Sequence, residues 1–322
     1  MDNNAAIAIE GLSKHFGDVV ALDNIDFEVA RGTVFGLLGP NGAGKTTAVR
    51  ILTTILRPDS GRVSVLGHDV VREAGTVRSL IGLAGQYAAV DGNLTGRENL
   101  RLIGRLTHIP RQQIAERASE LLTDFGLADA ADRLVRTYSG GMRRRLDLAA
   151  ALVHRPPVVF LDEPTTGLDP QGRLQMWAVI RQLVADGTTV LLTTQYLEEA
   201  DRLASCLVVV DHGKIIAEGT SEELKARLGN TVVELELGDE AEVIRAQQML
   251  AHVNAERDGK SVRFSTSDGA RSLVEKLCSL EDAGLKLTNL TVREPSLDDA
   301  FLALTGERPE GSGSDDGGEE RR

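Results

Sequence analysis

Short runs of β-type apolar residues, several of them alternating with polar positions, fill the first forty residues of the chain. The runs cover residues 7–9, 19–22, 25–29 and 34–38. Alternation with a period of two is typical of half-buried strands, whereas the unbroken run 34–38 predicts a fully buried strand. We therefore expect the chain to begin as a sheet, and a helix to follow over residues 46–55.

The middle of the chain changes from a helical pattern to alternating strands and helices. Apolar residues recur at helical spacing over residues 98–122, and Pro110 divides this stretch into two helices. It predicts a helical block, at about residues 87–155, inserted in an α/β frame. Apolar runs that predict strands then alternate with helical stretches, at residues 158–162, 189–193 and 207–211. Such alternation predicts a largely parallel sheet and an α/β fold.

A second, smaller unit is expected from residue 229 to residue 305. Predicted strands at residues 231–237, 262–264 and 285–292 alternate with predicted helices at residues 241–252, 273–280 and 297–304. This pattern indicates a small α+β domain without a chemical motif of its own. Residues 306–322 contain Gly, Ser, Pro, charged residues and nothing that could form a core, so we expect a disordered tail.

Composition narrows the class of protein. A chain of 322 residues suits one large domain, residues 1–228, and one small domain. The net charge of −12 argues against a nucleic-acid partner, which would favour a basic surface. The basic run 143–145 is interpreted as a solvated helix face. The two cysteines form no pair motif, which favours a reducing cytosol. No apolar run approaches a membrane span and the N-terminus does not resemble a signal peptide, so we expect a soluble chain.

The segment from Gly39 to Thr46, Gly-Pro-Asn-Gly-Ala-Gly-Lys-Thr, fits the pattern of a phosphate-binding P-loop. Glycines let the backbone curl so that several N–H groups converge on one polyphosphate. Lys45 supplies a charge for the β- and γ-phosphates, and the Thr46 hydroxyl is placed to ligate Mg²⁺. The strand before this loop and the helix after it complete the expected context, so we predict a nucleotide site.

Two further segments could act on the same nucleotide. The buried strand 158–162 ends in Asp162 and Glu163. Asp162 would bind Mg²⁺ and Glu163 would orient the attacking water, although many buried strands also end in an acid. Ser139, Gly140 and Gly141 precede an apolar helix and could form a second anion cradle or an ordinary Ser-capped helix start.

Together these motifs resemble the ATP-binding cassette (ABC) family in its transporter ATPase branch. The resemblance covers about residues 7–228 and implies a P-loop NTPase fold with a mixed sheet and an inserted helical subdomain. It implies ATP and Mg²⁺ as cofactors. In the family the loop residues contact the nucleotide, which here are Gly39, Pro40, Asn41, Gly42, Ala43, Gly44, Lys45, Thr46 and Thr47.

The same resemblance assigns six more positions. Gln86 falls where the family's glutamine reaches Mg²⁺ and relays to the membrane partner, and Phe16 falls where an aromatic ring stacks on adenine. Asp169 belongs to the family's D-loop, and Ser139–Gly141 to its signature. Tyr138 and Met142 depart from the commonest Leu and Gln of that signature. The family implies a head-to-tail dimer in which the signature of a second copy completes each ATP site.

One departure concerns the switch position, where the family usually has histidine. Here it is Gln195, which can donate a hydrogen bond to the γ-phosphate but cannot carry charge. A degenerate, inactive site is the alternative. Because Lys45, Asp162 and Glu163 are all present, we predict slow but real ATPase activity, with Glu163, Gln195 and Lys45 as the catalytic set.

Four segments narrow the family further, and their resemblance extends to about residue 305. They are 85–91, 138–145, 195–201 and 295–302, which look like the daunorubicin/doxorubicin-resistance ATP-binding subunits of actinobacteria. The resemblance implies a peripheral protein at the cytoplasmic face of the cell membrane. Its partner would be a separately encoded permease, and the pair would export hydrophobic drugs or lipids.

Other functions remain open at this stage. An exporter ATPase for another cargo, such as a polysaccharide or a lipid, would carry the same motifs. A soluble ABC ATPase without a transporter is a different class, but such factors usually carry two cassettes or long coiled coils. This chain shows one signature and no sustained heptads. In exporters of this family the contacts with the cargo lie mainly in the membrane subunits.

Overall fold

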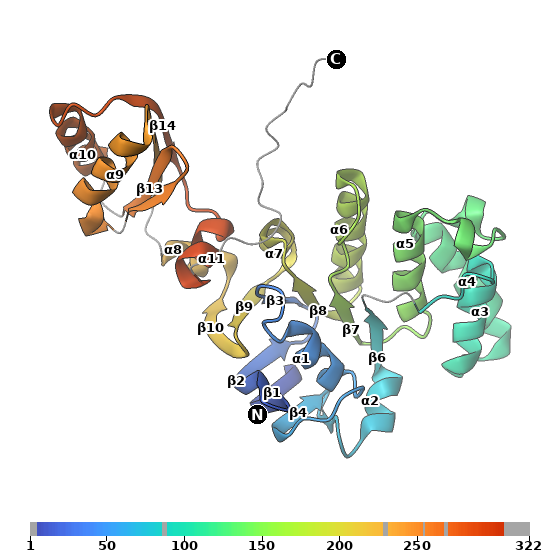
Figure 1. The fold of residues 1–322 in the computed structure, drawn as a ribbon. Helices are drawn as coiled ribbons and strands as arrows, with labels where there is room; N and C mark the ends of the chain where they lie inside the picture. The colour runs from blue at the N-terminus through green and yellow to red at the C-terminus, as the bar shows by residue number, and fades with distance from the viewer. Residues whose placement is uncertain (1–4, 86–88, 228–230, 254, 267–269, 306–322) are drawn as a thin grey trace. The chain divides into compact units, whose positions relative to one another are not determined.

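The chain forms two compact units, of which the second begins at Gly219 (Figure 1). The computed structural model describes residues 5–85, 89–227, 231–253, 255–266 and 270–305. The expected tail at 306–322 lies outside these residues. The second unit starts ten residues before the expected position 229. The reason is that helix α8 (Ser221–Ala226) packs on α11 (Leu297–Thr305), and these two helices are distant in sequence.

A four-stranded sheet opens the first unit. Its strands are β1 (Ala5–Phe16), β2 (Val19–Ala30), β4 (Ser60–Val65) and β5 (His68–Asp69), in the order β2-β1-β4-β5. The expected strands 19–22 and 25–29 form one continuous strand. Asn24, at a φ of 51°, shifts the register between them, and asparagine is among the residues that tolerate this left-handed conformation.

The six-stranded sheet of the first unit confirms the predicted parallel arrangement. It contains β3 (Val34–Leu38), β6 (Ile81–Ala84), β7 (Val158–Asp162), β8 (Thr189–Thr194), β9 (Cys206–Asp211) and β10 (Lys214–Gly219). The order is β10-β9-β3-β8-β7-β6, and β9, β3, β8, β7 and β6 pair in parallel. Parallel pairing brings the carboxyl ends of β3, β7 and β8 to one edge, where Leu38 pairs with Thr194 and Asp162 with Thr193.

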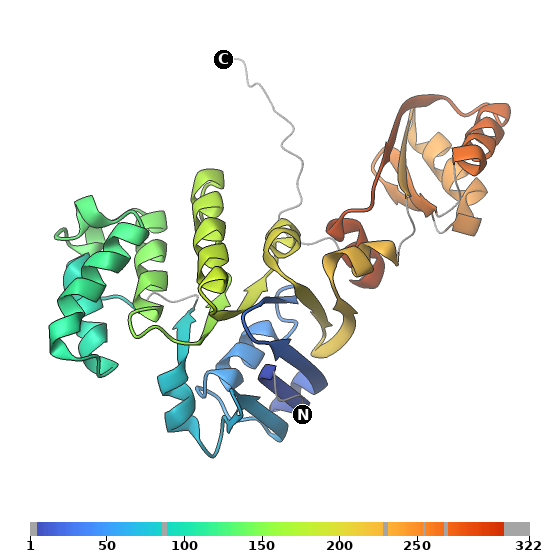
Figure 2. The ribbon, with the colours of Figure 1, turned by 180° about the vertical axis from the view of Figure 1, so that it is seen from behind.

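One group of helices packs around the parallel sheet, and a second group, the helical block, stands to one side of it (Figures 1 and 2). They are α1 (Lys45–Leu52), α2 (Ala74–Leu80), α6 (Pro170–Ala185) and α7 (Leu197–Leu203). The helical block contains α3 (Gly96–Leu106), α4 (Arg111–Asp124), α5 (Gly140–Ala151) and short 3₁₀ turns at Ala128–Ala130 and Val135–Thr137.

Alternate residues of β7 serve two separate hydrophobic cores. Val158 and Phe160 belong to the core shared with α1 and the four-stranded sheet. Val159 and Leu161 belong to the core shared with the helical block. Because both faces of this strand are fully buried, the backbone that carries Asp162 at its end has little freedom to move.

The second unit has its own sheet and core. Strands β11 (Thr231–Leu237), β12 (Glu256–Asp258), β13 (Ser261–Thr266) and β14 (Leu287–Arg293) pair in the order β12-β13-β11-β14. The helices α9 (Glu240–Met249) and α10 (Ala270–Asp282) and the short turn Ala251–Val253 complete it. Val233, Leu235 and Phe264 lie in its core.

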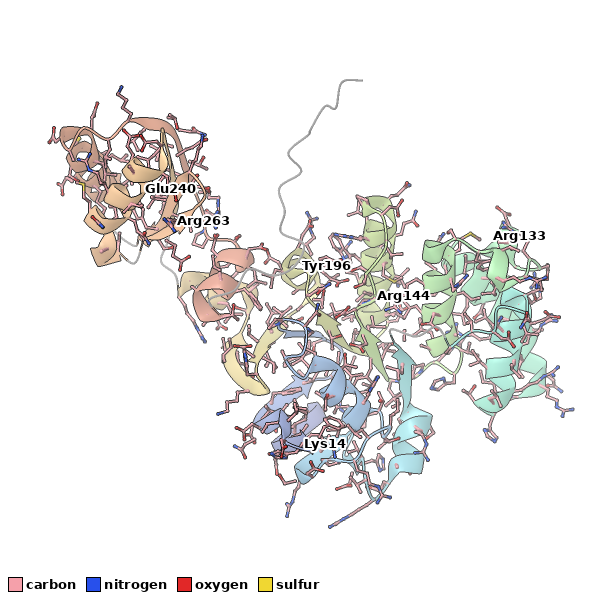
Figure 3. All side chains as sticks on the ribbon, viewed as in Figure 1. Lys14, Arg133, Arg144, Tyr196, Glu240 and Arg263 are labelled. Carbon is pink, nitrogen blue, oxygen red and sulfur yellow. The ribbon has the colours of Figure 1, made fainter. Side chains whose placement is uncertain are left out.

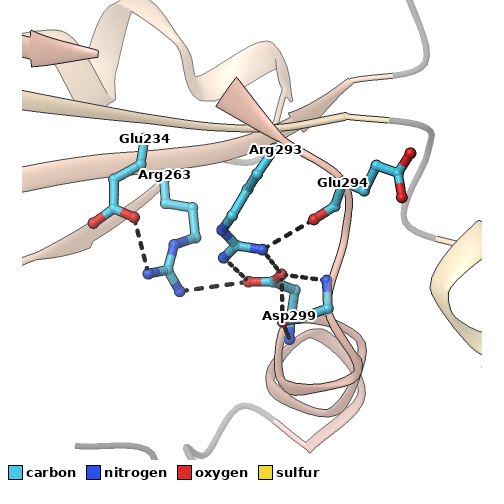
Figure 4. Close-up of polar contacts among 6 residues, drawn as sticks. Glu234, Arg263, Arg293, Glu294 and Asp299 are labelled. Carbon is cyan, nitrogen blue, oxygen red and sulfur yellow. Dashed lines mark hydrogen bonds and ion pairs between the residues drawn. The ribbon is translucent and has the colours of Figure 1, made fainter. Parts of the chain in front are cut away.

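An ionic cluster fastens α11 to this sheet (Figure 4). The Asp299 carboxylate accepts hydrogen bonds from both terminal nitrogens of Arg293, at 2.5 and 2.9 Å. Ser296 adds a backbone bond of 2.8 Å and a hydroxyl bond of 2.7 Å to the same carboxylate. Arg263 lies 3.6 Å from Asp299 and 3.3 Å from Glu234. Part of the segment that supported the narrower family resemblance is therefore a structural clasp.

Candidate functional site

The P-loop leaves the carboxyl end of β3 and leads directly into α1, as expected. Gly39, Gly42 and Gly44 have φ angles of 155°, 83° and 110°, which residues with a Cβ rarely adopt. A Cβ at Gly39 would lie 2.2 Å from the Val210 carbonyl oxygen, and one at Gly44 would lie 2.4 Å from the Ala21 carbonyl oxygen. Two of the three glycines are therefore required by packing as well as by conformation.

Lys45 lies inside this loop. Its Nζ donates to the carbonyl oxygens of Gly39 at 2.6 Å and Pro40 at 2.9 Å, and the residue is 5% exposed. Burial lowers the pKa of Lys45, and the charges of Glu163 and Asp162 oppose that shift. Gly44 carries no side chain that could cap α1, so the loop offers backbone N–H groups and a cation to an anion at the helix start.

The two acids lie at the carboxyl end of β7, which β8 separates from β3. Asp162 is 4% exposed, and its Oδ1 accepts a bond of 2.5 Å from the Thr193 hydroxyl. The Thr46 hydroxyl lies 3.4 Å from the same oxygen, so the two expected Mg²⁺ ligands lie side by side. Glu163 has a φ of 51°, and its N–H contacts the Thr193 carbonyl oxygen at 3.0 Å and hydroxyl at 3.2 Å.

The switch position follows β8 at the same edge. Gln195 comes directly after Thr194, which pairs with Leu38 at the start of the P-loop. The neighbouring Tyr196 packs under the guanidinium of Arg173 on α6, 4.5 Å from the ring centre. Three strand ends thus bring Lys45, the two acids and Gln195 to one edge of the sheet.

The signature segment does not join this cluster within one chain. Ser139 caps α5 by accepting a 3.2 Å bond from the N–H of Met142. In both views α5 stands with α3 and α4, away from α1 (Figures 1 and 2). The departure at Tyr138 has a packing reason, since its buried hydroxyl donates to the Ala130 carbonyl oxygen at 2.7 Å and anchors the segment to the helical block.

The other expected nucleotide residues have different surroundings. Phe16 is 49% exposed at the end of β1, and the Lys14 ammonium lies over its ring, 5.5 Å from the ring centre. Asp169 caps α6 through a 3.0 Å bond from the N–H of Gly172. Asn41 and Thr47 lie in the loop and in α1 respectively, and the Ala43 carbonyl oxygen accepts a 3.0 Å bond from the N–H of Gly213. Gln86 lies outside the described residues.

Arg144 is the residue that sequence reasoning missed, and the interpretation of residues 143–145 as a solvated face is wrong for it. Arg143 is exposed, but the Arg144 side chain is 14% exposed and turns from α5 to the end of β7 (Figure 3). It donates to the backbone carbonyl oxygens of Asp162 and Glu163, both at 2.8 Å. A run of three arginines carries no signal that could separate these orientations, because they depend on which face of α5 meets the sheet.

The fold has counterparts among solved structures. An ATP-binding subunit of an ABC transporter matches with a TM-score of 0.64 at 26% identity, over 69% of this chain and 92% of that chain. A nucleotide-free ATP-binding cassette from an ABC transporter matches with a TM-score of 0.63 at 28% identity, over 69% and 94%. The ABC transporter family model matches residues 22–166. The fold and the site define an ATP-binding cassette ATPase, an enzyme whose ATP hydrolysis is coupled to transport.

Curated relatives narrow this class. The daunorubicin resistance ATP-binding protein DrrA3 of Streptomyces coeruleorubidus is 52% identical, over 94% of this chain and 97% of the relative. The daunorubicin/doxorubicin resistance ATP-binding protein DrrA of Streptomyces peucetius is 48% identical, over 98% and 97%. A family model described as the DrrA1-3-like C-terminal domain matches residues 219–305. The chain belongs to the daunorubicin/doxorubicin-resistance family of ABC ATP-binding proteins.

Proposed function

We propose that this protein binds and hydrolyses ATP as a head-to-tail dimer and thereby drives a separately encoded membrane permease that exports hydrophobic drugs or lipids. The observation that carries the proposal is the meeting of Lys45, Asp162, Glu163 and Gln195 at one sheet edge, beside a P-loop with no side-chain cap on its helix. Such an edge, at the carboxyl ends of parallel strands, is where open α/β sheets bind ligands.

In this proposal the P-loop binds the ATP phosphates. The Lys45 ammonium exchanges its two carbonyl partners for the β- and γ-phosphate oxygens, and the N–H groups from Gly42 to Thr47 close around them. The exposed ring of Phe16 stacks on the adenine base. The amide of Gln195 donates to the γ-phosphate without adding charge.

Thr46 and Asp162 fit Mg²⁺, because they place a hydroxyl and a carboxylate oxygen next to each other and this ion prefers oxygen ligands. Bound there, Mg²⁺ would neutralise charge on the phosphates. Glu163 orients the attacking water and accepts its hydrogen bond, and the Thr166 hydroxyl, 3.3 Å from its Oε2, keeps the carboxylate in place.

The signature segment supports the dimer. Its N-terminal N–H groups and Ser139 form an anion-binding helix start, which stands away from α1 of the same chain. A second copy in head-to-tail orientation would bring Ser139, Gly140 and Gly141 to the γ-phosphate, with Asp169 at the interface. Closure of the dimer would then depend on that phosphate.

The proposals of a permease partner and of a drug cargo are supported by family membership and by the names of the relatives. Within the described residues no helix combines the length and apolar character needed to cross a bilayer. An exporter subunit of this kind would act from the cytoplasmic face of the membrane, and Gln86 would relay between ATP and permease. An alternative cargo is a polysaccharide or a lipid, and a cargo other than a drug is supported by a Nod factor export ATP-binding protein I of Cupriavidus metallidurans, which is 40% identical over 90% of this chain.

Drug efflux from cells that carry this chain and its permease tests the proposal. We expect efflux of hydrophobic drugs with the wild-type chain and none with Lys45→Ala, whose abundance is checked by immunoblot. A chain that hydrolyses ATP but supports no efflux of any drug would favour the alternative cargo. Equal efflux with Lys45→Ala would remove ATP binding at this loop from the mechanism.

A further inference from the structure

The Arg144 side chain fastens α5 to the backbone that carries both acids of the ATP site. Its Nη2 donates to the Asp162 and Glu163 carbonyl oxygens at 2.8 Å, and its Nε donates to the Pro164 carbonyl oxygen at 3.0 Å. Its Nη1 bonds the Gly85 carbonyl oxygen. A planar guanidinium is needed for this set, because only its fixed fork presents several N–H groups to diverging acceptors at once.

The backbone it holds is in a strained conformation. Glu163 has a φ of 51° and precedes Pro164, whose ring restricts its neighbour further. On one side, the N–H of Glu163 is held by Thr193 on β8. On the other side, its carbonyl oxygen is held by Arg144. Strained backbone at a site persists only where its surroundings hold it, and these two contacts do so.

The guanidinium is itself held in place. Asp147, one turn further along α5, lies 3.6 Å from Nη1 and is 2% exposed. Its Oδ1 accepts a 2.6 Å bond from the N–H of Ala89. Arg144 and Asp147 therefore both contact backbone groups of other segments, and the pair crosses from the helical block to the parallel sheet.

We propose that Arg144 is a positioning residue for ATP hydrolysis, which fixes the Glu163 backbone against α5 so that its carboxylate meets the attacking water. This inference rests on the proposed role of Glu163. The Arg144 contact also gives α5 a second role besides presenting the signature, because any displacement of α5 would move the Glu163 backbone through the guanidinium. Positioning errors of about 1 Å cost on the order of a hundredfold in rate, so loss of the fork should be visible in kcat.

The test compares Arg144→Lys and Arg144→Ala with Arg145→Ala in the full-length chain. Arg145 is the matched control because it lies next in α5 and bonds one carbonyl oxygen, that of Phe125, inside the helical block. We expect kcat to fall at least tenfold in both Arg144 variants, while the Kd for ATP stays within twofold of wild type. Arg145→Ala should keep its kcat. Guanidinium chloride at low concentration should restore part of the Arg144→Ala rate and none of the Glu163→Gln rate.

Distinct results would overturn the two claims. Unchanged kcat in both Arg144 variants, together with an inactive Glu163→Gln, would refute the positioning role alone. Wild-type activity in Glu163→Gln would refute the proposed role of Glu163 itself. A loss of kcat that appears equally in Arg145→Ala, with weaker ATP binding and no guanidinium rescue, would reduce Arg144 to a packing residue. If Arg144→Ala does not fold, Arg144→Lys still tests the positioning role, because lysine keeps the positive charge and lacks the planar set of guanidinium N–H donors.

Discussion

Replacing Thr193 by valine tests the strand-end contacts that hold the two acids. The substitution keeps the branched shape of the side chain and removes only its hydroxyl. That hydroxyl donates to Asp162 Oδ1 at 2.5 Å and accepts from the N–H of Glu163 at 3.2 Å. Thr193 is 0% exposed and Asp162 is 4% exposed, so water cannot easily replace the lost bond.

The cost follows from these contacts. A buried hydrogen bond to a charged group contributes about 1.5–3 kcal/mol, and the N–H of Glu163 keeps its second partner, the Thr193 carbonyl oxygen. We therefore expect about 2 kcal/mol of destabilisation of the first unit. For a unit of roughly 200 residues, about 2–4 °C per kcal/mol gives a decrease in Tm of about 4–8 °C.

The chain provides its own probe for this unit. Trp177 is its single tryptophan, lies on α6 and is 4% exposed, so its fluorescence follows unfolding of the first unit. Thr193→Ser, which keeps the hydroxyl, is the control and should retain most of the acids' geometry and ATPase activity. A Thr193→Val chain with wild-type Tm and wild-type ATPase rate would refute the idea that this hydroxyl holds Asp162.

The structure also predicts the direction of the effect of three further substitutions on stability or ATP binding. Asp299→Asn should lower the free energy of unfolding of the second unit by about 2 kcal/mol, which faster amide exchange in β11–β14 would show. The loss is smaller than for a fully buried ion pair because the Arg293 side chain is 35% exposed. Burial opposes ionisation of Asp299, but bonds from Arg293 and Ser296 outweigh it and lower its pKa, so this stability is present at neutral pH and is lost as the pH falls into the acid range. Glu199 lies in α7 and is 0% exposed, and this burial raises its pKa, so the wild-type chain loses stability as rising pH ionises the group. The Tm advantage of Glu199→Gln, followed by circular dichroism, should therefore grow with pH, and an advantage that does not change with pH would show that Glu199 is freely solvated. Gly44→Ala should abolish ATP binding in calorimetry, because its Cβ would lie 2.4 Å from the Ala21 carbonyl oxygen, whereas Gly67→Ala, also at positive φ but with open space around it, should bind normally.

Local chemistry explains which parts of the site could be predicted from sequence. The P-loop is formed by contiguous residues. Its glycines, Lys45 and Thr46 could therefore be recognised as a phosphate-binding pattern from the sequence alone. The strand ends could be placed because parallel strands have their carboxyl ends at a common edge of the sheet. This rule alone predicts that Asp162 lies close to the P-loop. The Ser139 cap was likewise a local signal, and the structure confirms it.

Other features depend on contacts between segments far apart in the sequence. The boundary at Gly219 follows from α8 packing on α11, and the role of Tyr138 follows from its bond to Ala130 across the helical block. The sequence alone was enough to predict a nucleotide site with a lysine, a hydroxyl and two acids. The inward orientation of Arg144, toward the strand that carries those acids, is visible in the folded chain alone, because packing against the sheet sets which face of α5 points inward and the run of charges does not.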